Sequence, residues 1–353
     1  MRIPCDLLKP NYKHMKKFLP IFVFSLFVLS CTRTVYVPVQ RPAQVYVDQS
    51  VQRLALIDRS ETERNAVNIT EGIITGTLPG LDEEASQAAM NGLASSLQEY
   101  QRFQVVRTSE QLKSPVTLPG QWPSILDWNH VEQLCRKYDV DGLLILEAFD
   151  SNFIVTDGSR EVEKKEEEGR VRKVREYYAE GVATVTLGFR FYHPASRTVI
   201  DEHRYSRNRK WEAKGNLLQL AMTNLIDHRE AVMQVSAQSG SLYATRISPH
   251  WYRANRSFFT KGKRDANFDI GVRRATVNDW TGAMEAWERS ASSSKRKTAG
   301  RSYYNLALMY EIQGDLETAL THAQKAYTDY GVKQARSYSN ILRRRIQDAE
   351  WLD

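Results

Sequence analysis

The chain has 353 residues, of which 42% are hydrophobic and 26% charged, close to the usage of folded globular proteins. This composition excludes a disordered or collagen-like chain, and at about 150 residues per domain the length predicts two domains. The net charge of +7 belongs to the C-terminal part, since residues 246–353 hold 19 Lys and Arg against 12 Asp and Glu. A basic face there would suit lipid headgroups, anionic glycans or an acidic partner protein.

Residues 1–30 have the pattern of a secretory signal peptide. Lys16 and Lys17 precede an apolar run over residues 21–29, which is the charged-then-apolar order of export signals. The run is shorter than the roughly 20 apolar residues that a transmembrane helix needs. Met15 also fits a translation start better than Met1, so the true start is expected there.

The apolar run ends in Val28-Leu29-Ser30-Cys31, which resembles the lipobox of bacterial lipoproteins. The resemblance implies that Cys31 is diacylated and becomes the N-terminus of the mature chain. The alternative is an ordinary buried thiol beside an uncleaved segment. No Asp and no acidic run follow Cys31, which in lipoproteins of this kind favours the periplasmic face of the outer membrane. The expected partners are therefore the membrane, through the lipid, and an envelope protein, whereas nucleic acid is not expected.

Residues 31–50 contain two prolines, Pro38 and Pro42, and little helical periodicity. We interpret this segment as a lipidated tether between the membrane and the folded body.

Residues 51–245 predict an α+β envelope domain, because strand-like and helical patterns alternate along them. Apolar runs at 53–58, 103–106 and 142–149 predict buried strands. One helix is expected to start at Asp82 as N-cap and to continue through Tyr100, and a second to start at Asp127 and cover Val131 to Tyr138.

Cys135 lies on the apolar face of the second predicted helix, at helical spacing from Val131 and Tyr138. A buried small hydrophobe is the usual fate of a free cysteine. A nucleophilic cysteine would need a histidine close by and an exposed, electropositive setting, and His130 falls off this face. We therefore interpret Cys135 as a core residue.

Two long strands are predicted at residues 182–192 and 199–211. In the first, Ala183, Val185, Leu187, Phe189 and Phe191 alternate with more polar residues, as in an antiparallel sheet with one buried face. The charged segment 159–176 is interpreted as a solvated hairpin tip or a disordered loop, with a partner-binding finger as the alternative.

The order of these elements is similar to that of envelope domains such as the curli-secretion lipoprotein and the N-terminal domain of the Tol translocation protein. That resemblance rests on order and spacing alone, and it implies partner docking or assembly at the outer membrane. A further helix is expected over residues 216–235, packed against the sheet.

Residues 240–252 are interpreted as a bridge to the last domain. Together with Arg253, Arg256, Phe258 and Phe259, they resemble a segment of an uncharacterised family of bacterial envelope lipoproteins, in which it also precedes helical repeats. The resemblance covers most of the chain and implies no known activity.

Residues 246–353 predict an all-α module of tetratricopeptide-like repeats with a capping helix at 337–352. The repeat spacing is carried by a set of aromatic, Leu, Gly and small residues at the positions that pack paired helices. These repeat-packing residues are Tyr303, Leu306, Ala307, Tyr310, Gly314, Ala319, Ala323 and Ala326. A degenerate earlier copy runs from Ala275 to Trp287. The whole chain is thus expected to be α+β, with a mixed sheet and packed helices followed by this helical module.

The sequence holds no Walker loop, no G-x-G-x-x-G, no H-E-x-x-H, no C-x-x-C and no nucleophile elbow. We therefore expect no catalytic residues, no cofactor and no metal. The favoured function is a membrane-anchored protein-binding or assembly scaffold in the bacterial cell envelope. The alternative is an envelope hydrolase or glycan-acting enzyme whose site is built from distant residues.

Overall fold

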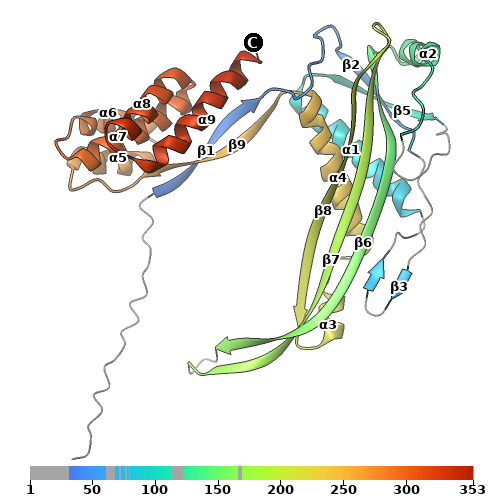
Figure 1. Ribbon diagram of the computed structural model, residues 1–353, viewed down its shortest axis with the longest axis horizontal. Coiled ribbons are helices and arrows are strands. Elements are labelled where there is room, and N and C mark those ends of the chain that lie inside the picture. The colour runs from blue at the N-terminus through green and yellow to red at the C-terminus, as the bar shows by residue number, and fades with distance from the viewer. Residues whose placement is uncertain are drawn as a thin grey trace, which may run out of the picture.

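A computed structural model of the chain describes residues 32–60, 68–70, 73–75, 78, 80–112, 122–165 and 169–352. A mixed sheet with packed helices forms one part, five helices form another, and a two-stranded ribbon connects them (Figure 1). The predicted α+β fold class is confirmed. The predicted signal segment and Cys31 lie outside the described residues.

The sheet is mixed because parallel and antiparallel strands meet on β6 (Gly142–Lys165). Strand β2 (Arg53–Asp58) runs parallel to β6 on one side and to β5 (Gln104–Gln111) on the other. The strands β7 (Val171–His193) and β8 (Thr198–Gly215) continue the sheet antiparallel beyond β6. Two short strands, β3 (Asn68–Thr70) and β4 (Ile73–Thr75), form a small hairpin whose second strand pairs with β6 near its middle.

Helices cover both faces of this sheet. The apolar side of β7 that the alternation predicted, from Ala183 to Phe191, packs with α1 (Leu81–Tyr100) and α4 (His228–Ile247) in one core. On the opposite face α2 (Trp128–Tyr138) packs Val131, Leu134 and Cys135 against Ala55 and Ile145. The predicted cap of α2 is confirmed, since the Asp127 carboxylate accepts hydrogen bonds from the backbone N–H groups of Asn129 and His130.

The helices α1 and α4 lie side by side (Figure 1) and cross at two glycines. A Cβ at Gly92 would lie 2.1 Å from the Ala237 carbonyl oxygen, and a Cβ at Gly240 would lie 1.8 Å from the Ala89 carbonyl oxygen. The Ser241 hydroxyl also donates to the Gly92 carbonyl at 3.1 Å. Only glycine permits this backbone approach.

Two helix predictions in this part were wrong. Asp82 does not cap α1, whose N-cap is Gly80 in the left-handed conformation; the Asp82 side chain instead turns inward and accepts a hydrogen bond from the Ser151 hydroxyl. The single helix expected at 216–235 is two helices, α3 (Leu218–Thr223) and α4, because Asp227 caps α4 by accepting from the Glu230 backbone N–H. The expected bridge from 240 is helical as far as Ile247.

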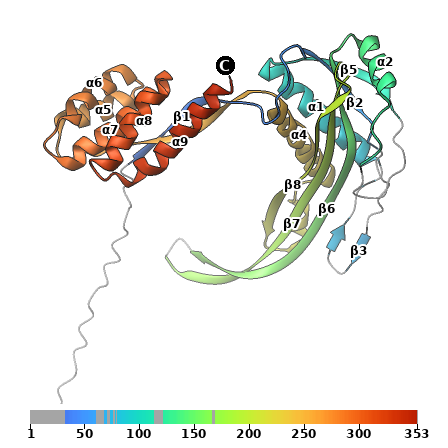
Figure 2. The ribbon, with the colours of Figure 1, turned by 45° about the horizontal axis from the view of Figure 1, so that its top comes forward.

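The strands β6 and β7 form a long curved hairpin, which Figure 2 shows sweeping away from the helices. At about 3.3 Å per residue, the 24 residues of β6 span roughly 80 Å. Pairing continues out to Lys165 opposite Val171, so most of the charged segment 159–176 is paired strand, with mainly exposed side chains. The hairpin interpretation of this segment is thereby favoured over a disordered loop.

The expected tether is the largest departure from the sequence interpretation. Residues 32–41 form β1 (Thr32–Arg41), which pairs antiparallel with β9 (His250–Phe259) over ten residues. Val37 and Val39 are buried against the helical module, and this apolar burial is why the segment is ordered. The tether prediction is wrong for these residues.

The C-terminal module consists, in the described residues, of α5 (Ala266–Thr276), α6 (Trp280–Ala291), α7 (Arg296–Gln313), α8 (Leu316–Thr328) and α9 (Lys333–Glu350). Each helix packs on the next, and their core includes the buried residues of the ribbon. No helix in the described parts of the chain is long and apolar enough to cross a membrane.

Candidate binding groove

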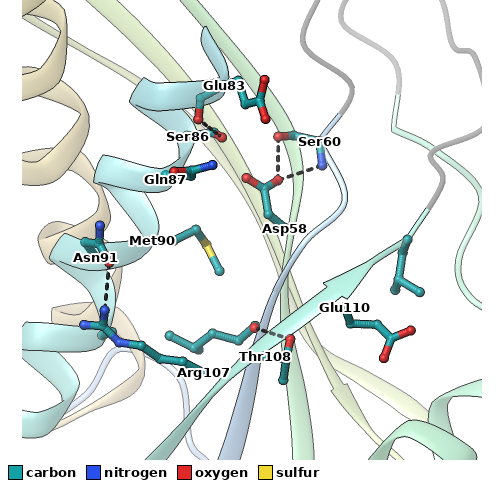
Figure 3. Close-up of a pocket in the computed structure, with 13 residues that line it drawn as sticks. Asp58, Ser60, Glu83, Ser86, Gln87, Met90, Asn91, Arg107, Thr108 and Glu110 are labelled. Carbon is teal, nitrogen blue, oxygen red and sulfur yellow. Dashed lines mark hydrogen bonds between the residues drawn. The ribbon is translucent and has the colours of Figure 1, made fainter. Parts of the chain in front are cut away.

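A groove of about 540 Å³ lies between the first half of α1 and the ends of β2 and β5 (Figure 3). From α1, the side chains of Gln87 and Met90 point toward the strands, and Asp58 points toward the helix from the end of β2. The lining residues are Leu56, Asp58, Ser60, Glu83, Ser86, Gln87, Met90, Asn91, Ala94, Arg107, Thr108, Glu110 and Leu112.

The groove lies along the polar side of α1. The buried side of α1 carries Ala85, Ala89 and Leu93, which pack in the core. Its polar residues Glu83, Gln87 and Asn91 follow at helical i, i+4 spacing and therefore form a stripe that faces the groove.

Local hydrogen bonds hold several polar groups of the groove in place. The Asp58 carboxylate accepts from the backbone N–H and the hydroxyl of Ser60, at 2.9 and 2.6 Å. The Arg107 guanidinium donates to the Asn91 amide oxygen at 2.9 Å, which ties β5 to α1 across the floor. The Thr108 hydroxyl donates to the Leu56 carbonyl at 3.1 Å.

Glu110 forms hydrogen bonds with residues of α2. Its carboxylate accepts from the Lys137 ammonium at 2.6 Å and from the Tyr138 hydroxyl at 2.7 Å. These hydrogen bonds, the one from Lys137 first, hold the pKa of Glu110 below its usual value. The Glu110 carboxylate is therefore held toward α2 at this end of the groove.

The strand β5 offers a second kind of contact. In the described sheet, β2 pairs with one edge of β5 and no strand pairs with its other edge. An unpaired edge presents backbone N–H and C=O groups that can hydrogen-bond an added strand. Fixed polar side chains beside a free strand edge suit the binding of an extended peptide.

A buried carboxyl lies next to the groove. Asp82 is 4% exposed, and burial raises its pKa to about 6, against the lowering effect of the Ser151 hydrogen bond. It belongs to the contact between α1 and β6, and it does not line the groove.

Two clusters of charged side chains, centred on buried glutamates, stabilise the fold. Glu147 on β6 accepts from the Arg59 guanidinium at 3.1 Å and from the Tyr192 hydroxyl at 2.6 Å; burial raises its pKa against these partners. In the module, Glu311 on α7 accepts from Arg256 on β9 and from Arg345 on α9, at 2.8 and 2.7 Å.

Burial would raise the pKa of Glu311, but the hydrogen bonds and charge of Arg256 and the hydrogen bonds of Tyr338 and Arg345 outweigh it, so the pKa lies below the usual value. Every one of these carboxylates has cationic or hydroxyl partners. We therefore assign the two clusters a structural role.

Cys135 is free and buried, as predicted. Burial first, and then the charge of Asp141, raise the pKa of its thiol to about 12. A thiol in this state is a poor nucleophile at neutral pH. In the described part of the chain, no group of three or more His, Cys, Asp or Glu side chains could hold a metal ion.

The predicted repeat-packing residues lie together on α7, α8 and the turn between them. Gly314 ends α7 with a φ of +87°, and Asp315 caps α8 by accepting from the Thr318 backbone N–H at 3.0 Å. Tyr303 and Tyr310 are partly buried and both contact the His322 ring. The other members are at most 1% exposed, namely Leu306, Ala307, Ala319, Ala323 and Ala326.

Sequence reasoning missed the groove. The spacing of Glu83, Gln87 and Asn91 was visible as a polar stripe, but its significance depends on β5 lying beside it. Cys31, the one predicted modification site, lies outside the described residues.

Two family models match the chain. Residues 51–259 match the family described as Domain of unknown function (DUF8603), which is more than half of the chain. The chain belongs to this family. Residues 269–344, within the helical module, match a second one, Domain of unknown function (DUF6340). No curated protein matches.

Solved structures give only weak similarities. A PelC dodecamer from Paraburkholderia phytofirmans is 12% identical, with 62% of this chain and 98% of that chain covered and a TM-score of 0.23. A putative neuraminyllactose-binding hemagglutinin homolog from Helicobacter pylori is 14% identical, with 58% and 88% covered and a TM-score of 0.26. A Xanthomonas campestris protein assigned to DUF330 is 10% identical, with 58% and 91% covered and a TM-score of 0.25.

Proposed function

We propose that this chain is a membrane-anchored lipoprotein that acts as a protein-binding or assembly scaffold in the bacterial cell envelope. The observation that carries the proposal is the groove between α1 and β5, where an edge of β5 that no described strand pairs with runs beside fixed polar side chains. The carboxylates Asp58 and Glu110 are both engaged in hydrogen bonds within the chain, which supports recognition over hydrolysis.

In this proposal an extended segment of the partner adds to the outer edge of β5. Main-chain hydrogen bonds would supply affinity, and the alternating side chains of the segment would meet the groove on one face. The Arg107 guanidinium, held by Asn91, and the Asp58 carboxylate, held by Ser60, both line the groove and favour a segment that carries both signs of charge.

The anchor in this proposal is a lipid on Cys31. Its support is the sequence Val28-Leu29-Ser30-Cys31, which resembles a lipobox, after an apolar segment too short to span a bilayer. The expected location is the periplasmic face of the outer membrane.

The C-terminal module is proposed to be tetratricopeptide-like. The supporting features are the Gly314 turn, the Asp315 cap and the buried small residues where α7 meets α8. Tetratricopeptide-like helix pairs are common protein-binding units, which agrees with a scaffold.

Site-specific crosslinking in native membranes tests the groove. A photoreactive amino acid would replace Gln87, which lines the groove, and in a matched control Gln98, an exposed glutamine on the same helix outside it. A defined protein adduct is expected from position 87 and not from position 98. Equal adducts from both positions, or none from position 87, would refute the groove as a docking site.

The anchor is tested separately. Labelling with a radioactive fatty acid should mark the wild-type chain and not Cys31→Ala, and the variant should leave the membrane fraction. Equal labelling and equal fractionation of the two forms would refute the lipoprotein assignment.

A further inference from the structure

A second cavity, of about 690 Å³, lies in the helical module at the start of α7 and α9. Six of its eleven lining residues are Lys or Arg, and none of these eleven is Asp or Glu. The cations are Lys263, Lys295, Arg296, Lys297, Arg301 and Lys333. So many like charges around a concave surface repel one another, and an anion inside would relieve that repulsion.

Contacts with aromatic rings and carbonyls hold some of these cations in fixed positions. The Arg301 guanidinium lies 4.7 Å from the centre of the Phe259 ring and donates to the Lys261 carbonyl. The Arg296 guanidinium lies 5.8 Å from the Tyr330 ring centre. Stacked guanidinium groups keep N–H donors available at their edges, which suits planar and tetrahedral oxyanions.

The backbone brings further positive charge to the same place. Neither α7 nor α9 has a side-chain cap or an acidic residue in its first turn, so the positive end of each helix dipole is not offset by a local carboxylate there. At Gly300 an added Cβ would lie 2.5 Å from the Tyr330 Cβ. This close approach brings the turn before α9 against α7.

Asp265 is an acidic group whose pKa would be raised by burial but is lowered by hydrogen bonds and in part by the charge of Lys295, one of the lining cations. Asp265 caps α5 by accepting from the Phe268 backbone N–H at 3.0 Å, and it also accepts from the Ser290 hydroxyl at 3.0 Å. Its carboxylate does not line the cavity, and it is a single negative charge beside six lining cations.

The cavity lies close to the start of β1. Thr32, the residue after Cys31, pairs across the ribbon with Phe259, and Phe259 lines the cavity. Paired residues in antiparallel strands lie about 5 Å apart. Asn305 on α7 fixes this end of the ribbon, because its side chain hydrogen-bonds both the N–H and the C=O of Phe259, at 2.7 and 3.0 Å.

We propose that this cavity binds the phosphate of an anionic phospholipid headgroup at the membrane surface. The choice of a phospholipid as the source of the anion rests on the proposed lipid at Cys31; the choice of an anion rests on the cavity alone. The volume suits a headgroup-sized ligand.

Vesicle binding of the full chain tests the proposal. Partition onto vesicles of 30% phosphatidylglycerol in phosphatidylcholine would be compared with partition onto pure phosphatidylcholine. The cavity variant is Lys295→Gln, Arg296→Gln, Lys297→Gln, all exposed positions. The matched control is Arg273→Gln, Arg343→Gln, Arg344→Gln, which removes the same charge from exposed positions of the module outside the cavity.

The wild type should prefer anionic vesicles, and the cavity variant should lose most of that preference, by roughly 100-fold if each cation contributes as a membrane-facing Lys or Arg does. The control variant should lose much less. Every chain keeps the same N-terminal apolar segment, so its contribution cancels in the comparison. Equal losses in the two variants, or no preference in the wild type, would overturn the proposal.

Isothermal titration with inorganic phosphate distinguishes the two sources of phosphate. Saturable binding of inorganic phosphate by a wild type that shows no preference for anionic vesicles would identify free phosphate as the ligand and overturn the phospholipid assignment. Cys31→Ala should keep the vesicle preference, since the cavity needs no acyl chain. Loss of fatty acid labelling would therefore refute the anchor, whereas loss of the vesicle preference would refute the cavity.

Discussion

The buried carboxyl of Asp82 should make this fold less stable as the pH rises from 4 to 7. Its pKa is raised from 3.8 to about 6 by burial in the contact between α1 and β6. The folded state therefore holds this proton over a range in which the unfolded chain has released it. The stabilising contribution is complete below pH 3.8 and is lost as the pH rises through 6.

The size of the effect follows from the shift in pKa. A change from 3.8 to about 6 corresponds to about 3 kcal/mol, at about 1.4 kcal/mol per unit. Asp82→Asn keeps the size of the side chain and an oxygen that accepts from Ser151, but it carries no charge. The variant should therefore be more stable than the wild type at pH 7.5, by up to about 3 kcal/mol, and the difference should vanish near pH 4.

Urea titrations at several pH values, followed by tryptophan fluorescence, measure the free energy of unfolding of both forms. Glu83→Gln is the matched control, because its side chain is the exposed neighbour of Asp82 on α1; its difference from the wild type should stay small and flat with pH. A difference between Asp82→Asn and the wild type that does not change between pH 4 and 7.5 would refute the reasoning.

Three further predictions concern packing and reactivity. Glu311→Gln should lower the free energy of unfolding of the helical module by up to about 3–5 kcal/mol, because two partly buried arginines lose their counter-charge; calorimetry measures it, and an unchanged melting temperature would contradict it. Gly240→Ala should cost at least about 1–3 kcal/mol, since its Cβ would meet the Ala89 carbonyl, whereas Gln238→Ala on the exposed side of α4 should be nearly neutral. Cys135 should react with a maleimide at neutral pH only as fast as the fold opens; mass spectrometry under native conditions would show a rapid adduct if this is wrong.

The sequence predicted best where one face of an element is buried along its whole length. The strict alternation of Ala183, Val185 and Leu187 identified the buried face of β7, because a period of two has only one structural meaning. Asp127 identified the start of α2, because a carboxylate before an apolar helical face satisfies the free N–H groups there.

The sequence interpretation failed where a residue type is compatible with two different local structures. Gly240 was interpreted as the start of a bridge to the last domain, whereas it lies within α4 and permits the contact of that helix with α1. Asp227 caps α4, and with Glu230 three residues later it had the spacing of a capping pair, but the apolar residues around it suggested one continuous helix. Pro38 suggested a tether, whereas it lies exposed on the two-stranded ribbon between the buried Val37 and Val39.

The groove could not be predicted, because its walls come from parts of the chain that only the fold brings together. Asp58 ends β2, Gln87 lies on α1 and Glu110 lies on β5. The position of the Glu110 carboxylate is set by hydrogen bonds from Lys137 and Tyr138, which lie almost thirty residues away in the sequence. Local patterns report local structure, and this site is defined by long-range contacts.

The two-stranded ribbon of β1 and β9 affects how far from the membrane an anchored chain would hold the groove between α1 and β5. With a lipid on Cys31, a flexible tether would have let the sheet domain approach the bilayer freely. Instead the first ten residues after Cys31 are paired with β9, and at about 3.3 Å per residue they extend roughly 33 Å from the helical module to the sheet domain. The helical module, with its basic cavity, would then lie at the membrane, and the groove between α1 and β5 would be held away from it. A partner reached through that groove would therefore be a protein that extends into the periplasm, rather than one confined to the bilayer surface.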